Sequence, residues 1–379
     1  MESAFSEVIG QADVISRLVQ TAREDRVPQA LLFCGMPGVG KLALAMGFAA
    51  YLLSEGTPSM PVTAPNARAM LRLWEHPDLH FSFPTIKKAG TSSGYKPVSD
   101  DFAKPWHELI MRGPYFSIEQ WLRQMGATTQ QGIITAREGD ELLRKLSLKS
   151  SLGGYKVSII WLPERAGEEF SNGILKLLEE PPQHTVFMLV SEEPDLLLDT
   201  IRSRTQRIDV KPIGETSLAE ALQTRRGLDE ATARQVARVA QGSWLEAMQI
   251  LSPNNENADF LEMFQKLMRL CYMRDIGGLK TWSQQAAELG REKEKRMLSY
   301  FLEQVRENFM YNFRIPELCY QTRAEADFSR NFARFINERN VIEMSELFEM
   351  AIRDVGQNAN GKIVFFDMAL KLIVLILRK

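Results

Sequence analysis

The chain has 379 residues, of which 45% are hydrophobic and 25% are charged, and its formal net charge is −2. This length exceeds one ordinary domain, so two or three domains are expected. The charge balance argues against a dedicated nucleic-acid-binding protein, so any DNA contact must be local or shared with partners. The widely spaced Cys34, Cys271 and Cys319 suggest neither a disulfide framework nor a cysteine zinc site, and they favour a reducing cytoplasm.

The two ends of the chain bear on export and membrane insertion. The N-terminal MESAFSEVIG has no basic segment followed by an apolar run. The most apolar stretch, IVFFDMALKLIVLIL near the C-terminus, is short for a membrane span and carries Asp367 and Lys371. We therefore expect neither secretion nor a membrane contact.

Residues 1–211 alternate short apolar runs with helical periodicity, a pattern typical of a parallel sheet flanked by helices. The run ALLFC at 30–34 predicts a buried strand, and LALAMGFAAYLL behind the next loop predicts a helix. Further strands are predicted at 157–161 (VSIIW) and 185–190 (TVFMLV). These elements predict an α/β P-loop domain.

Two later regions depart from this alternation. Residues 76–132 are interpreted as an insertion with a flexible GTSSG tip, and their aromatic residues predict a small satellite core. Beyond residue 211 the patterns are helical, with three short helices in 212–252 and several longer ones in 253–379. A small helical domain and an all-α C-terminal domain are therefore expected.

The loop after the first predicted strand, FCGMPGVGK, contains the spacing of a phosphate-binding loop. Gly35, Gly38 and Gly40 allow backbone N–H groups to turn inward around phosphate oxygens, and Lys41 reaches the outer phosphates. The next residue normally supplies a hydroxyl ligand for magnesium, but Leu42 has no such atom. The cradle is therefore predicted to persist without its metal ligand.

The end of the strand at 157–161 should carry the acidic residues that bind magnesium and orient the attacking water. Trp161 and Leu162 occupy these positions instead, and Glu164 is interpreted as an ordinary surface residue. His76 and His80 have a spacing that could place both on one helical face, but Pro77 interrupts it and no further Cys or His is near. A structural role is expected for this pair.

Several stretches, taken in order, resemble the bacterial sliding-clamp loader family, and within it the delta prime subunit of DNA polymerase III. They are FSEVIGQADVISRL, PQALLFCGMPGVGK, KLSLKSSLGGYKVSIIW, NGILKLLEEPPQHTVFMLV and DTIRSRTQRI. The resemblance covers residues 1 to about 250, and NANGKIVFFDMALKL resembles the last helices of the family's collar. It implies an AAA+ core at 1–211, a helical lid at 212–252 and a collar for oligomerisation at 253–379.

The family resemblance implies partners and a mechanism. It implies a hetero-pentamer with gamma/tau motor subunits and a delta subunit, which opens a ring-shaped clamp with ATP and closes it on primed DNA. The delta prime subunit is usually the stationary member that does not hydrolyse ATP. Its Ser-Arg-Cys motif directs an arginine into a neighbour's ATP site, and the matching residues here are Ser203, Arg204 and Thr205.

Arg204 is therefore the candidate trans arginine, and Arg202 and Arg207 are its competitors. The alternative is that all three are solvated arginines on the protein surface. Ser191 falls where the family places a polar residue that senses the nucleotide phosphate, and a capping role before EEPDLL is an equal alternative. The family's ATP-responsive members carry a lid arginine, for which GSWLEAM offers Trp244, Leu245 and Glu246. The negative Glu246 would repel phosphates.

The resemblance also bears on cofactors. Many relatives carry a four-cysteine zinc module, but residues 51–74 contain no cysteine, so no zinc is expected. No cofactor is required by this interpretation. The loop of Gly35, Gly38, Gly40 and Lys41 could still hold nucleotide or phosphate weakly, or could persist only as a structural turn. The alternative function is an active AAA+ ATPase, either a clamp-loader motor or a DNA-remodelling motor, which Leu42, Trp161 and Leu162 oppose.

Overall fold

The computed structural model describes residues 4–88, 90–92, 94–127, 130–252, 256–315 and 319–378. The chain forms two compact units, one made of Met1–Ala237 with Gln241–Glu246 and the other of Arg238–Ala240 with Ala247–Lys379. Each unit has its own hydrophobic core. The domain boundaries expected at residues 211 and 252 stay predictions.

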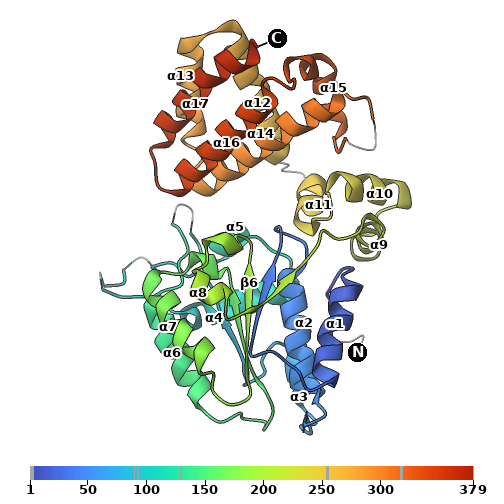
Figure 1. The fold of residues 1–379 in the computed structure, drawn as a ribbon, viewed down its shortest axis with the longest axis vertical. Helices are drawn as coiled ribbons and strands as arrows, with labels where there is room; N and C mark the ends of the chain where they lie inside the picture. The colour runs from blue at the N-terminus through green and yellow to red at the C-terminus, as the bar shows by residue number, and fades with distance from the viewer. Residues whose placement is uncertain are drawn as a thin grey trace. The chain divides into compact units, whose positions relative to one another are not determined.

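A five-stranded parallel sheet forms the centre of the first unit, with the strand order β4-β5-β6-β1-β7 (Figure 1). The strands are β1 (Ala30–Cys34), β4 (Leu79–Ser82), β5 (Lys156–Trp161), β6 (Thr185–Ser191) and β7 (Gln206–Asp209). Strands β1, β5 and β6 are buried along their whole length, as expected for parallel strands covered on both faces. The predicted P-loop (AAA+) fold class, with a parallel sheet followed by helices, is confirmed.

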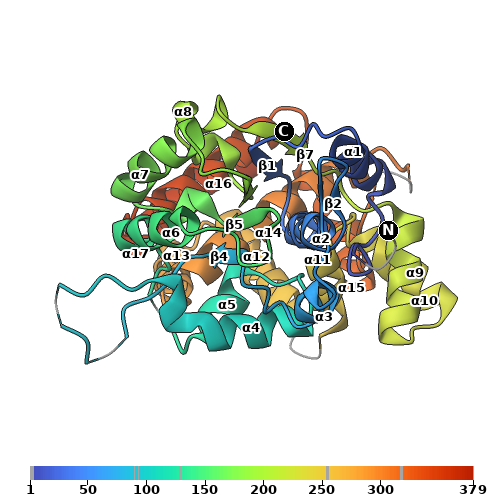
Figure 2. The same cartoon turned by 90° about the horizontal axis from the view of Figure 1, so that it is seen from below.

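Helices cover the sheet on both faces (Figures 1 and 2). Helices α1 (Ala12–Arg23) and α2 (Lys41–Ser54) lie on one side, and α6 (Ala136–Ser147), α7 (Glu168–Glu179) and α8 (Asp199–Arg202) on the other. The side chains of each strand alternate between the two layers: Leu31 and Phe33 join the core beneath α1 and α2, whereas Leu32 joins the core beneath α6 and α7.

The predicted insertion begins later than expected. Strand β4 lies inside the interval 76–132, yet it pairs with β5 as an edge strand of the main sheet. The prediction that the insertion starts at residue 76 is therefore wrong at that end. The GTSSG tip includes Ser93, which lies outside the described residues together with the nearby Ala89.

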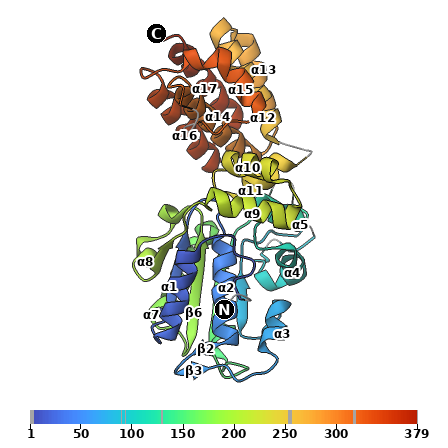
Figure 3. The same cartoon turned by 90° about the vertical axis from the view of Figure 1, so that its right-hand side faces the viewer.

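The insertion folds into α4 (Ala103–Arg112) and α5 (Ile118–Gln124), which follow a short 3-10 helix, η1 (Ser99–Phe102). Helices α4 and α5 lie next to each other on the side of the first unit that also carries α3 (Ala67–Arg72) (Figures 2 and 3). Their aromatic residues belong to the same core as α1 and α2, because Trp106 stacks on Phe83 with ring centroids 4.1 Å apart. The predicted satellite core is therefore part of the main core.

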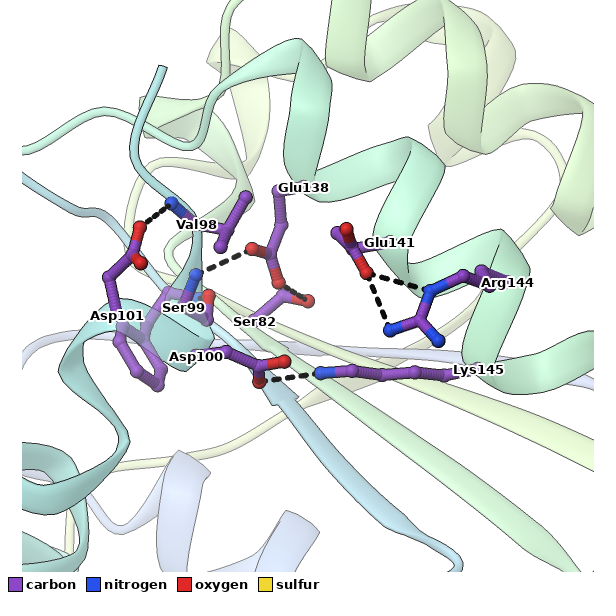
Figure 4. Close-up of polar contacts among 10 residues, drawn as sticks. Ser82, Val98, Ser99, Asp100, Asp101, Glu138, Glu141, Arg144 and Lys145 are labelled. Carbon is purple, nitrogen blue, oxygen red and sulfur yellow. Dashed lines mark hydrogen bonds and ion pairs between the residues drawn. The ribbon is translucent and has the colours of Figure 1, made fainter. Parts of the chain in front are cut away.

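A buried carboxylate fixes the start of the insertion to the sheet (Figure 4). Glu138 of α6 accepts a hydrogen bond of 2.7 Å from the Ser82 hydroxyl of β4 and one of 2.6 Å from the Ser99 backbone N–H. An ion pair of 2.6 Å between Lys145 and Asp100 lies beside it. A buried acid that has lost its water needs such partners, so this cluster holds β4, η1 and α6 in one arrangement.

The other elements that the structure describes are helices and a short hairpin. The hairpin pairs β2 (Gly56–Thr57) with β3 (Met60–Pro61). The three short helices predicted in 212–252 are confirmed as α9 (Glu215–Arg226), α10 (Glu230–Val239) and α11 (Trp244–Leu251). Further 3-10 turns are η2 (Pro163–Arg165) and η3 (Pro194–Leu196).

The second unit is helical. It contains α12 (Glu256–Met273), α13 (Ile276–Ala286), α14 (Arg291–Tyr311), α15 (Arg323–Phe332), α16 (Val341–Gly356) and α17 (Gly361–Ile376), with a 3-10 turn η5 (Ala333–Phe335). Large aromatic residues fill its centre, including Trp282, Phe301 and Phe348. Across the described residues, no helix is both long and apolar enough to cross a membrane.

Candidate functional site

The phosphate loop stands where a P-loop fold places it, between the carboxyl end of β1 and the first turn of α2. Gly35, Gly38 and Gly40 have φ values of 155°, 80° and 99°. Residues with a Cβ adopt such angles rarely, so the glycines make this turn possible. Gly40 is the N-cap of α2, and the positive end of the helix dipole therefore points toward the loop.

Lys41 is turned inward, and its side chain is only 4% exposed. Its ammonium donates hydrogen bonds to the backbone oxygens of Gly35, at 2.7 Å, and Met36, at 2.5 Å. Its Nζ lies 3.7 Å from a carboxylate oxygen of Glu192. Burial lowers the pKa of Lys41, while the negative charges of Glu192 and Glu164 oppose that shift. The loop lysine is thus held by its own loop and by an acidic partner.

Two glutamates that no sequence pattern singled out for this site lie beside Lys41. Burial raises the pKa of Glu192 to about 7, against the opposing charge of Lys41. Glu164 accepts hydrogen bonds from the backbone N–H groups of Glu192, at 2.8 Å, and Glu193, at 3.2 Å. The interpretation of Glu164 as an ordinary surface residue is wrong. Leu162 adopts a left-handed φ of 55°, which starts the turn η2 and brings Glu164 back over the end of β6.

The positions that would serve a metal ion are apolar and buried. Leu42 is 5% exposed, Trp161 3% and Leu162 1%. Trp161 packs between aromatic rings of the insertion, with ring centroids 5.1 Å from Phe116 and 5.4 Å from Trp106. Magnesium binds oxygen ligands. These three side chains supply none.

The first turn of α11 is docked against the loop. The Trp244 N–H donates to the backbone oxygen of Gly38 at 3.0 Å, and the Ser243 hydroxyl donates to that of Pro37, also at 3.0 Å. A Cβ on Gly38 would lie 2.2 Å from the Ser243 oxygen, so this close approach requires glycine. Leu245 lines the remaining space, whereas Glu246 is exposed. The apolar Leu245, rather than the charge of Glu246, therefore faces the loop.

The space left at the loop is very small. Its volume is about 20 Å³, and it is lined by residues of the loop, of β5 and β6, of the lid and of the insertion, among them Pro114, Tyr115 and Phe116. That volume holds about one water molecule. A nucleoside triphosphate is far larger, and no metal ligand accompanies it. The residues present at this loop do not fit ATP in this arrangement.

Ser191, the predicted phosphate sensor, is not among the residues that line this space. Its neighbours Val190 and Glu192 face the loop, and the alternation along the strand directs Ser191 to the opposite side. Its side chain is fully buried, and its hydroxyl has no hydrogen-bond partner among the described residues. The structure therefore does not bring Ser191 to the loop, and it gives no capping contact either.

Arg204 follows α8 on the surface of the first unit. Its guanidinium forms an ion pair of 2.6 Å with Glu179, the last residue of α7, and donates to the backbone oxygen of Thr200 at 3.0 Å. The side chain remains 37% exposed. The Thr205 hydroxyl bonds back to the oxygens of Ile201 and Arg202, both at 3.2 Å. These contacts order the segment around Arg204.

The two competing arginines are also paired with acids. Arg202 bonds to Asp195 at 3.1 Å and to Asp199 of its own helix. Arg207 bonds to Asp209 at 2.7 Å, and this hydrogen bond raises the pKa of Arg207. All three arginines thus have partners within the chain, and geometry alone does not single out Arg204.

Arg204 does not reach the chain's own phosphate loop. It precedes the amino end of the edge strand β7, whereas the loop leaves the carboxyl end of the neighbouring strand β1. Because these strands are parallel, Arg204 and the phosphate loop lie at opposite ends of the strands. The length of such a strand separates them by roughly 13 Å or more. Any phosphate that Arg204 contacts therefore belongs to another molecule.

The family assignment follows from a match that covers most of the first unit. The model of the protein family described as "DNA polymerase III, delta subunit" matches residues 10–214, just over half of the chain. The chain belongs to the DNA polymerase III clamp-loader family. The match spans the sheet, the phosphate loop and the Arg204 segment, and it ends before the Ser243 and Trp244 that contact the loop.

Individual relatives in this clamp-loader family are distant. The chain is 26% identical over 268 residues to the DNA polymerase III subunit delta′ of Bacillus subtilis, covering 70% of this chain and 66% of that protein. It is 26% identical over 244 residues to the delta′ subunit of Escherichia coli, covering 64% and 60%. It is 25% identical over 252 residues to the tau/gamma subunit of Haemophilus influenzae, covering 65% and 30%. The chain thus spans between about a third and two thirds of the length of these curated relatives.

Metal ligands were also sought throughout the described ranges. No three His, Cys, Asp or Glu side chains gather there as a metal site. His76 accepts a hydrogen bond of 3.2 Å from the Asp78 N–H, and burial lowers its pKa. Burial also lowers the pKa of His80 to about 4. His76 is buried and His80 is partly exposed, and the structural role expected for this pair stays a prediction.

Proposed function

We propose that this chain is the delta prime subunit of a DNA polymerase III clamp loader, an ATP-silent member that assembles with motor subunits of the gamma/tau type and a delta subunit in a cytoplasmic hetero-pentamer. It contributes Arg204 to a neighbouring motor's ATP site and thereby helps to load the sliding clamp on primed DNA. The observation that carries the proposal is the burial of Trp161 and Leu162 at the end of β5, where an active site needs carboxylates.

The contacts of the phosphate loop support the silent role. A motor subunit must admit ATP and magnesium, and it must release the products in each cycle. Here Lys41 is bonded to its own loop, Leu42 replaces the metal-binding hydroxyl, and the lid is hydrogen-bonded to Gly38. Each of these three features differs from what an active motor needs.

The exposure of Arg204 supports the trans role. A positive charge aimed at a neighbour's phosphates stabilises the negative charge that develops as the phosphoryl group is transferred. Arg204 is ordered by Glu179 and the Thr200 carbonyl, yet it remains partly exposed and cannot reach its own loop. A surface ion pair contributes only about 0–1 kcal/mol, so a neighbour's phosphates can replace Glu179 at little cost.

Reconstitution tests this function directly. The isolated chain should show no ATP turnover, and its addition to purified motor and delta subunits should raise the turnover of the complex. Lys41→Met, which replaces the buried ammonium with an apolar chain of similar length, should leave that stimulation intact. Turnover by the isolated chain that disappears in Lys41→Met would instead identify an active motor, and failure to join the complex would remove the clamp-loader role.

A further inference from the structure

The connection between α4 and α5 enters the space that a nucleotide would need. This connection, residues 113–117, belongs to the insertion, and its Pro114, Tyr115 and Phe116 line the small cavity beside the loop. Its position distinguishes it from an ordinary surface loop, because Phe116 is 6% exposed and belongs to the main core. The insertion thus supplies side chains to a pocket formed by sequence far from it.

Tyr115 contacts three parts of the first unit at once. Its hydroxyl accepts a hydrogen bond of 2.9 Å from the backbone N–H of Ile9, 106 residues away in the chain. Its ring faces Gly40, where an added Cβ would lie 2.8 Å from the hydroxyl oxygen. Its ring centroid lies 6.1 Å from that of Trp244 in the lid. One side chain therefore links the N-terminal segment, the phosphate loop and the lid.

The connection is held firmly on both sides. Trp106 and Ile110 of α4 and Trp121 of α5 are buried in the same core, so neither helix can shift without exposing large apolar side chains. Ser117 begins α5 with a capping box, in which its hydroxyl accepts from the Gln120 N–H and its own N–H donates to the Gln120 side chain. Phe116 packs against Trp161. These contacts anchor both ends of the connection that carries Tyr115 into the pocket.

The pocket that receives Tyr115 and Phe116 has lost the oxygen ligands of a metal site but keeps its glycine turn. Such a turn would otherwise leave a hollow at the end of the sheet, in which Leu42, Trp161 and Leu245 form an apolar wall beside Lys41 and Glu192. An aromatic side chain with one hydroxyl matches these surroundings, because its ring fills the hollow while its oxygen satisfies the Ile9 N–H. Burial raises the pKa of Tyr115 to about 12, so the phenol stays neutral there.

We propose that Tyr115 and Phe116 are a built-in occupant of the nucleotide pocket, which takes the place of a bound nucleotide and holds the phosphate loop, the N-terminal segment and the lid in one closed arrangement. This inference deepens the proposed function and rests on one part of it, the ATP-silent loop. It does not depend on Arg204. The insertion is thereby assigned a function, as the internal ligand of a pocket that ATP no longer uses.

Hydrogen exchange of the full chain tests the link made by the hydroxyl. Tyr115→Phe removes one oxygen and keeps the ring, so the fold should persist. The Ile9 amide should then exchange about tenfold faster, because its acceptor is gone. Tyr95→Phe is the matched control, since Tyr95 lies in the same insertion and its hydroxyl donates to Asp101, away from the loop. Unchanged exchange of Ile9 in Tyr115→Phe would overturn the assignment.

Calorimetric titration with ADP tests the occupancy. The wild-type chain and Tyr95→Ala should release no heat of binding, whereas Tyr115→Ala should bind ADP at least tenfold more tightly than the wild type. Adding Lys41→Met to Tyr115→Ala should abolish that binding, because the loop cation is lost. ADP binding by the wild type equal to that of Tyr115→Ala would overturn the proposal, as would a folded Tyr115→Ala chain that neither binds ADP nor exchanges its Ile9 and Trp244 amides faster.

These results separate the two proposals. If Arg204→Ala left the ATP turnover of the reconstituted loader unchanged, the role of Arg204 would be removed, and the ADP and exchange results would be unaffected. Conversely, a wild-type chain that binds ADP as tightly as Tyr115→Ala does, but shows no ATP turnover, would overturn the built-in occupant while leaving the ATP-silent function in place.

Discussion

The phosphate loop and the Arg204 segment are two parts of this molecule that our proposal relates to ATP chemistry, and they are stabilised in opposite ways. The loop holds its lysine buried, it is hydrogen-bonded to its own surroundings through Lys41 and Gly38, and Tyr115 lies close to its Gly40. Arg204 lies on the surface and is held by an ion pair to Glu179 and one carbonyl. The buried contacts of the loop resist rearrangement, whereas the surface ion pair of Arg204 can be exchanged readily for another partner. The loop that we propose to be silent is tied to the core, while a residue proposed to act elsewhere stays accessible.

The largest effect expected at the loop comes from Trp161→Asp. This change removes a ring packed against Phe116 and Trp106 and buries a carboxylate in its place. We expect the free energy of unfolding to fall by about 5 kcal/mol, with no gain of ATP hydrolysis. Chemical denaturation and a steady-state ATPase assay check this. A stable variant that hydrolyses ATP would show that the pocket is an active site lacking one carboxylate.

A comparably large effect, but on rate, is expected from Arg204→Ala in the reconstituted loader. Turnover at the neighbouring ATP site should fall on the order of 10^3-fold, which corresponds to about 4 kcal/mol, while assembly stays intact. Single-turnover hydrolysis by the complex measures it. Arg207→Ala is the matched control, because Arg207 is also exposed and paired to an acid. Equal losses in both variants would show that general surface charge, and not Arg204, is responsible.

An intermediate effect is expected from Gly38→Ala. Gly38 has a φ of 80°, and an added Cβ would lie 2.2 Å from the Ser243 oxygen. Gly153→Ala is the matched control, because Gly153 has a φ of 79° and open space around it. The control should lose about 1 kcal/mol of unfolding free energy to backbone strain, and Gly38→Ala about 2–3 kcal/mol. Equal losses would mean that the lid is not docked on the loop.

The smallest effect is expected from pH. Burial raises the pKa of Glu192 from its ordinary 4.5 to about 7, so the folded chain holds this proton more tightly than the unfolded chain. The stability that Glu192 contributes is therefore fully present below pH 4.5 and is lost as the pH rises through about 7. The wild-type chain should lose unfolding free energy between about pH 5 and about pH 8. In Glu192→Gln that loss should be smaller than in the wild type by on the order of 2 kcal/mol. Glu193→Gln should keep the wild-type profile.

The sequence predicted the elements that carry a strong local signal. Strand β1, the glycine loop and α2 follow from an apolar run, a glycine spacing and a helical period, all within about 25 residues. Strands β4 and β7 escaped prediction because they lie at the edges of the sheet. Only Ile208 of β7 is buried, and β4 is interrupted by a half-buried His80, so neither shows the period of a core strand.

The chemistry of the site was predictable in part for the same reason. Leu42, Trp161 and Leu162 stand at fixed offsets from recognisable elements, and the absence of oxygen ligands can be read from their side chains alone. Glu192 and Tyr115 have no such offsets. The left-handed φ of Leu162 turns the chain so that Glu164 lies against the end of β6. The interpretation of Glu164 as a surface residue assumed that the chain leaves the strand without such a turn.

The amino-acid sequence by itself determined that this P-loop lacks a metal ligand and that the chain resembles a clamp-loader subunit, because both follow from residue types at short, regular spacings. Only the tertiary structure decided what fills the loop. Tyr115 reaches Gly40 and Ile9 across long stretches of chain, through two helices whose buried faces fix its position. Such contacts depend on how the core packs as a whole, and no local pattern encodes them.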